Sequence, residues 1–88
     1  GKWVAAICAA PSVFGGLGFL KDKEATSYPG CLDGIPVGVY KEDPVVVDGN
    51  VVTSRGVGTA IAFALKLIEV LLSKEKAEEI AASIIYSA

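Results

Sequence analysis

The sequence of 88 residues contains no histidine, no methionine and only two cysteines. Imidazole and paired thiolates are the usual ligands of transition metals, so without histidine or a CxxC pair we expect no metal site built by this chain alone. Two cysteines do not make a disulfide framework in a domain of this kind, and a reducing, cytoplasmic setting is therefore expected.

The chain also lacks a basic surface signature and a continuous membrane-spanning pattern. Its eight basic and ten acidic residues give a net charge of -2, with no basic patch interleaved with aromatics, which argues against nucleic-acid binding. The uncharged run 3–20 resembles a signal peptide or a membrane span in length. Proline and glycine interrupt it at Pro11, Gly15, Gly16 and Gly18, so we favour neither reading.

Apolar residues, by contrast, are abundant. They make up 52% of the chain, and the mean hydropathy is +0.53. Small domains bury a smaller share of their surface than large ones and need more polar residues, so this composition is too apolar for so short a soluble chain. The chain also begins directly with a strand-like run and has no methionine. We therefore expect at most one domain, and a piece of a larger domain or a chain completed by a partner.

The rest of the chain is organised around residues 3–18, WVAAICAAPSVFGGLG. A short apolar run, Val4–Ile7, leads into Cys8, and small residues and Pro11 then open a helix-like stretch. This order is typical of a nucleophile elbow, in which a tight turn presents one side chain at the carboxyl end of a sheet. The backbone N–H groups of the following helix then point at the atom under attack. The alternative is a free structural cysteine on a core strand.

The middle of the chain predicts short elements. We expect core positions at Leu17, Phe19 and Leu20, a short strand over 25–30 that ends in a Pro-Gly turn, and another over 37–40. Cys31 is interpreted as a structural thiol. Valine runs at 45–47 and 51–52 flank Asp48-Gly49, which predicts a hairpin with a second strand over 50–54.

Two helices are predicted after the hairpin. The first runs from Thr59, a plausible N-cap, to about Leu72, and its nearly uniform apolar surface must be covered on most sides. The glycines before it lack the full GxGxxG fingerprint, so a nucleotide site is not favoured. Ser73 is expected to cap the last helix, whose apolar face is predicted from helical spacing. That face consists of Ala77, Ile80, Ala81, Ile84 and Ile85. The order of strands and helices fits an α/β architecture.

The segments VAAICAAP, ATSYPG, DGNVVTSRGVGTAIAFALKLIE and KEKAEEIA resemble the C-terminal half of the ThiJ/PfpI family, in its deglycase-like branch. The resemblance covers essentially all residues. It implies that residues 1–88 form the C-terminal half of a single class I glutamine amidotransferase-like domain with a flavodoxin-like three-layer α/β sandwich. It also implies a partner segment carrying the N-terminal half, a homodimer of the complete domain, and no metal or organic cofactor.

The resemblance assigns roles to individual residues. Cys8 matches the reactive cysteine of the family, and Ala9 matches the residue whose backbone N–H contributes to an oxyanion pocket. Tyr28 occupies a position where some members place a histidine, and Gly56 and Val57 lie in the glycine turn that borders the pocket. Two features depart from the pattern: the glutamate that pairs with the cysteine lies outside this chain, and Ala9 stands where peptidase-like and amidotransferase-like branches have histidine.

The function that follows is a cysteine-dependent glyoxalase or deglycase reaction on small α-oxoaldehydes, such as methylglyoxal, or on their protein adducts. Cys8 would act as thiolate together with the absent glutamate, and the chain alone is expected to be inactive. The main alternative is a redox-sensing or chaperone-like stress protein that uses oxidation of Cys8. A cysteine peptidase is less favoured, because no histidine is present to act as the base. A role in thiazole synthesis has no support in these residues.

Overall fold

The computed structural model describes residues 2–86. One strand and a short helix are followed by four strands, and two helices end the described chain, in the order that the sequence predicts. The elements are β1 (Val4–Ile7), α1 (Pro11–Gly16), β2 (Glu24–Ala25), β3 (Val39–Tyr40), β4 (Val45–Asp48), β5 (Val51–Ser54), a 3-10 turn η1 (Val57–Thr59), α2 (Ala60–Leu71) and α3 (Lys74–Ser83). The predicted strand over 25–30 is reduced to β2, and the next amide, Thr26 N–H, donates to the side-chain Oγ1 of Thr53 instead of continuing the ladder.

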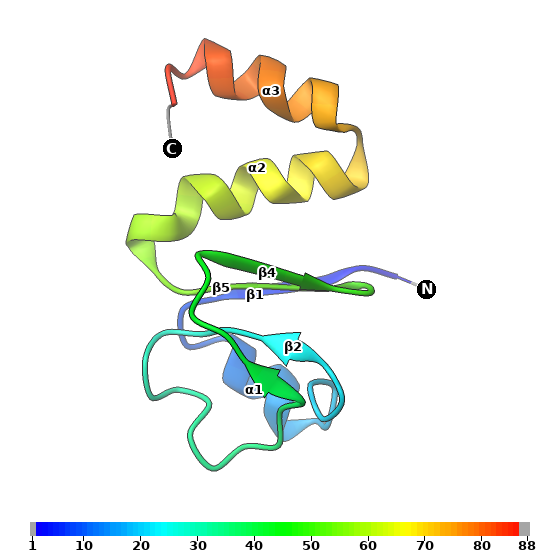
Figure 1. Cartoon of the computed structure of the whole chain (residues 1–88), viewed down its shortest axis with the longest axis vertical. Coiled ribbons are helices and arrows are strands. Elements are labelled where there is room, and N and C mark those ends of the chain that lie inside the picture. The colour runs from blue at the N-terminus through cyan, green and yellow to red at the C-terminus, as the bar shows by residue number, and fades with distance from the viewer. Residues whose placement is uncertain (1, 87–88) are drawn as a thin grey trace.

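The main sheet has three strands in the order β1-β5-β4. β5 pairs in parallel with β1 and antiparallel with β4, and all four of its residues are buried. Figure 1 shows α2 on one side of this sheet, α3 stacked on the far side of α2, and α1 with β2 on the opposite side. A central buried strand between helical layers is the arrangement that α/β sequences favour.

The β4–β5 hairpin is confirmed, but its turn lies one residue later than predicted. Asp48 pairs with Val51 inside the ladder, so the two-residue loop consists of Gly49 and Asn50. Gly49 has a φ of 59° and stands first in the loop, where type II′ turns require glycine. The Asp48 side chain is used elsewhere: its Oδ2 accepts a hydrogen bond of 2.8 Å from the Glu24 N–H.

The core on the α1 side of the sheet is small. Leu20, Ala25, Leu32 and Val51 form it, with Phe14 among the half-buried residues around it. The core prediction is correct for Leu20 and wrong for its two neighbours, since Leu17 is 63% and Phe19 is 52% exposed. α1 ends at Gly16, and the turn that follows directs only one of these three side chains toward the sheet.

α2 is apolar on nearly every side and incompletely covered. None of its residues is buried, and Ile61 and Leu71 are about half exposed although the sheet and α3 flank the helix. The requirement for further cover predicted from its sequence is thus unmet within residues 2–86. On its surface, Lys66 donates a 2.9 Å hydrogen bond to Glu69, and this bond, with the lysine charge, lowers the pKa of the Glu69 carboxyl.

α3 begins where the sequence predicts, but it ends earlier than predicted. Ser73 Oγ accepts a hydrogen bond of 3.0 Å from the Lys76 N–H, which is the predicted N-cap. Ala77 is buried as expected. The helix stops at Ser83, however, and Ile85 takes a left-handed φ of 57°, so Ile84 and Ile85 are exposed instead of extending the apolar face.

Among residues 2–86, no helix combines the length and the apolar composition that a membrane crossing requires.

Candidate active site at the Cys8 elbow

The strand–turn–helix predicted around Cys8 is present. β1 ends at Ile7, α1 begins at Pro11, and Cys8 lies in the turn with a φ of 66°. Left-handed backbone costs a residue with a Cβ about 1–3 kcal/mol and persists only where the surrounding structure enforces it. The Cys8 side chain is half-buried and its thiol is free. The geometry is that of a nucleophile elbow, which holds one side chain at the end of a strand.

Hydrogen bonds to both backbone groups of Cys8 hold this conformation. The Cys8 N–H donates to the Ser54 carbonyl at 3.2 Å, at the carboxyl end of β5. The Cys8 carbonyl accepts from the Tyr28 N–H at 2.8 Å, in the segment after β2. The elbow is therefore fastened to two segments that lie far from it in the sequence.

The backbone N–H of Ala9 is available beside the thiol. Within residues 2–86 it donates no hydrogen bond, whereas the Ala10 N–H donates to the Ile7 carbonyl at 3.2 Å and the Ser12 N–H to the Ala9 carbonyl at 3.0 Å. Ala9 is also exposed. An exposed, unused amide next to a nucleophile is the donor that a developing oxyanion requires.

The glycine turn after β5 forms one wall of an open groove of about 320 Å³. Three predicted site residues, Tyr28, Gly56 and Val57, meet there, and Val57 is 95% exposed. Cys8 and Ala9 do not line this groove. They connect to it through the hydrogen bond between the Tyr28 N–H and the Cys8 carbonyl. The structure thus brings the predicted residues into one neighbourhood without enclosing them.

Thr59 has a different role from the predicted one. It precedes α2, but its side chain does not cap that helix. Instead Thr59 Oγ1 accepts hydrogen bonds from the N–H groups of Arg55, at 3.2 Å, and Gly56, at 3.1 Å. Threonine side chains commonly bond to nearby backbone amides in turns, so Thr59 fixes the glycine turn that borders the groove.

Arg55 is a site residue that the sequence pattern did not single out, and it follows directly after β5. Its Nε donates to the Ser27 carbonyl at 3.1 Å and its Nη2 to Tyr40 Oη at 2.9 Å. The guanidinium also lies 5.9 Å from the centre of the Tyr40 ring and 4.0 Å from a Glu42 carboxylate oxygen. It is the only arginine of the chain, directly before the glycine turn, and that isolation is the signal that could have identified it.

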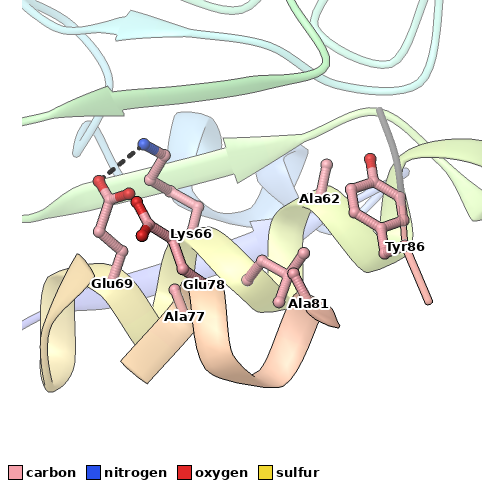
Figure 2. A pocket seen from close by; sticks show the side chains of 8 residues that line it. Ala62, Lys66, Glu69, Ala77, Glu78, Ala81 and Tyr86 are labelled. Carbon is pink, nitrogen blue, oxygen red and sulfur yellow. Dashed lines mark hydrogen bonds and ion pairs between the residues drawn. The ribbon is translucent and has the colours of Figure 1, made fainter. Parts of the chain in front are cut away.

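A second, larger groove of about 430 Å³ lies between α2 and α3. Figure 2 shows Lys66, Glu69, Ala77 and Glu78 toward one end and Ala62 and Tyr86 toward the other. It contains no cysteine or hydroxyl nucleophile beyond Tyr86, so it does not displace the elbow as the candidate site. Within residues 2–86, no three His, Cys, Asp or Glu side chains are arranged to hold a metal ion.

A mixed sheet flanked by helices, with a cysteine in a left-handed turn at the carboxyl end of a strand that pairs in parallel, defines an α/β protein with a cysteine at a nucleophile elbow. The model of the DJ-1/PfpI family matches residues 1–70. The chain belongs to the DJ-1/PfpI family, and its fold is flavodoxin-like, as the sequence resemblance implied.

Individual relatives agree with this assignment. Protein dj-1beta of Drosophila melanogaster is 48% identical over 83 residues, which are 92% of this chain and 44% of the relative. A protein of Schizosaccharomyces pombe, named glutathione-independent glyoxalase DJ-1, is 40% identical over 85% of this chain and 40% of its own length. The solved structure of oxidized DJ-1 from Toxoplasma gondii is 46% identical, with a TM-score of 0.91 over all of this chain and 48% of that one. The chain thus spans less than half the length of the relatives it matches.

Proposed function

We propose that this chain carries the nucleophile of a glyoxalase- or deglycase-type enzyme that acts on small α-oxoaldehydes. The observation that carries the proposal is the geometry of Cys8, held at a φ of 66° beside the unused Ala9 N–H. The similarity of the chain to an S. pombe protein named as a glutathione-independent glyoxalase supports the same reaction class. Tyr28, Gly56 and Val57 would border the substrate in the open groove.

The chemistry uses the thiolate, which is the nucleophilic form of cysteine. Cys8 Sγ attacks the aldehyde carbon of methylglyoxal, a C–S bond forms, and the carbonyl oxygen becomes an oxyanion that accepts a hydrogen bond from the Ala9 N–H. A carboxylate then moves a proton from the former aldehyde carbon to the neighbouring carbonyl carbon. The oxyanion becomes the carbonyl of a thioester, and the former ketone oxygen takes up the proton that the thiol released and becomes a hydroxyl group. Water cleaves the thioester, which releases the hydroxy acid and restores the thiol.

The carboxylate in this scheme comes from outside residues 2–86, and so does part of the sheet. Within residues 2–86, β1 pairs only with β5, so its other edge presents unpaired backbone N–H and C=O groups on which a further strand could pair. We infer that a segment carrying the N-terminal half of the domain supplies a glutamate, a further strand beside β1 and cover for exposed apolar side chains. The complete domain is proposed to be a cytoplasmic homodimer.

Substitution of the thiol tests the proposed function. In the full-length protein, Cys8→Ser should reduce consumption of methylglyoxal and formation of lactate by at least about 100-fold, because the hydroxyl is a far weaker nucleophile. Cys31→Ser is the matched control and should retain the unsubstituted activity, since the scheme does not use Cys31. Full turnover by Cys8→Ser would rule the proposal out.

A redox-sensing role for the same cysteine is the second candidate. It is favoured by the incomplete burial of Cys8 and by the similarity to a T. gondii structure described as oxidized. Peroxide titration followed by mass analysis distinguishes the two cysteines. A sensor should take up oxygen at Cys8 before Cys31, and a binding or chaperone activity should change with it. Equal and slow oxidation of both thiols would dismiss this role.

A further inference from the structure

The hydrogen bonds around Cys8 close into a ring. The Cys8 N–H donates to the Ser54 carbonyl, and the Cys8 carbonyl accepts from the Tyr28 N–H. Ser54 is covalently linked to Arg55, and Tyr28 to Ser27. The ring closes where Arg55 Nε donates to the Ser27 carbonyl at 3.1 Å.

We propose that Arg55 is a positioning residue for Cys8. Its guanidinium joins the end of β5 to segment 26–28, the two places where the backbone of Cys8 is fastened. Neither segment alone determines the elbow, because each bonds only one of its two backbone groups. The Arg55 side chain sets their separation and thereby enforces the left-handed conformation of Cys8.

The surroundings of Arg55 fit this role. The side chain is only 20% exposed, and Tyr40 Oη holds its Nη2 at 2.9 Å. Glu42 contributes a carboxylate oxygen at 4.0 Å. The planar guanidinium can bond two acceptors in fixed directions, whereas a lysine ammonium is a compact donor on a flexible stem. Arginine is thus suited to bridging Ser27 and Tyr40 at once.

The inference deepens the proposed function and rests on it for its consequence in catalysis. If the elbow relaxes, Cys8 Sγ moves relative to the Ala9 N–H, and the alignment of nucleophile and oxyanion donor is lost. Such a loss lowers kcat more than it raises KM, since both groups act on the reacting atoms and not on the remainder of the substrate.

Amide hydrogen exchange measured by NMR on the full-length protein tests the positioning role directly. The variants are Arg55→Gln, which removes the fork, and Arg55→Lys, which keeps the charge. The matched control is Lys41→Gln, which removes one positive charge from an exposed ion pair with Glu24 and leaves the ring intact. In Arg55→Gln, exchange at the Cys8 and Tyr28 amides should accelerate by at least about tenfold, with unchanged amides in the middle of the β4–β5 pair.

Arg55→Lys should show a smaller selective acceleration, and Lys41→Gln none. If hydrogen exchange in Arg55→Gln accelerates equally at all amides, Arg55 stabilises the whole fold and does not position Cys8, which would overturn the inference. Unchanged exchange at Cys8 and Tyr28 would overturn it as well. Where Arg55→Gln does not fold, Arg55→Lys decides, because it keeps the charge but loses the planar fork that bonds the Ser27 carbonyl in a fixed direction; a selective acceleration at Cys8 and Tyr28 supports the role, and its absence refutes it. The exchange experiment is carried out without an aldehyde substrate. A lack of methylglyoxal turnover by the unsubstituted protein would therefore count against the proposed function and not against the positioning role.

Discussion

Cys8 occupies a backbone conformation that residues with a Cβ avoid, and it is also the residue with the most reactive side chain of the elbow. A left-handed φ is tolerated here because β5 and the segment after β2 bond its amide and its carbonyl. This conformation places the half-buried thiol at the end of β1, in the residue before Ala9. Chemistry and strain therefore coincide in one residue.

The strain predicts an unusual order of stabilities among Cys8 variants. Cys8→Gly should be more stable than Cys8→Ala by about 1 kcal/mol, since glycine has no Cβ to oppose a φ of 66°. Denaturant unfolding of the two variants measures the difference. Elsewhere in regular structure glycine is the less stable choice, so an advantage for alanine at position 8 would contradict the conformation described here.

Gly38 provides a second residue-scale test. A Cβ at this position would lie 2.7–2.8 Å from backbone atoms of Asp22 and Lys23, where β3 begins to pair with β2. Backbone cannot move aside as a flexible side chain does, so Gly38→Ala should lower the free energy of unfolding by about 1–3 kcal/mol. Gly58→Ala is the control, because nothing lies within 4 Å of its added Cβ. Equal stability of the two variants in denaturant unfolding would contradict the close approach.

At the scale of elements, the start of α3 was predicted correctly and its end was not. Ser73 caps α3 as expected, since an N-cap needs only one side chain and an amide three residues away. The end of α3 was wrong, because Ile85 turns left-handed without the glycine that normally marks such a stop. The hairpin was predicted correctly in its strands and shifted by one residue in its turn.

The Ser73 N-cap is expected to stabilise α3 measurably. Ser73→Ala removes the acceptor of the Lys76 N–H and should cost about 1 kcal/mol, seen as lower helicity of the last segment or a lower Tm. Ser83→Ala serves as control, because Ser83 Oγ only donates to the Ile80 carbonyl within its own helix. An equally large loss in Ser83→Ala would argue against capping as the cause.

At the scale of the whole molecule, apolar surface remains uncovered. α2 has no buried residue, and Leu17, Phe19 and Val57 are more than half exposed. Such surfaces mark contacts with other protein when they are contiguous. Together with an unpaired edge of β1 within residues 2–86, they support the inference that a complementary half-domain packs here.

Native mass spectrometry of the purified protein, followed by denaturing mass analysis, checks this inference. We expect a second polypeptide of similar mass bound to the chain, or a covalent continuation of it. With that complement present, amides of β1 should exchange more slowly, because their free edge becomes paired. A lone 9.1 kDa species with full protection of β1 would contradict a missing half-domain.

The sequence alone determined the α/β class, the elbow at Cys8, the hairpin and the cap at Ser73, because each depends on spacing and on residue types close together in the chain. Only the tertiary structure decided which of Leu17, Phe19 and Leu20 enters the core, and which acceptors Thr59 and Arg55 find. These outcomes depend on segments separated by tens of residues, such as Ser27 and Arg55, and periodicity carries no information about such distant pairs. The left-handed conformation of Cys8 depends on both the local sequence and the tertiary structure, because the local sequence places the turn and hydrogen bonds from distant segments hold it.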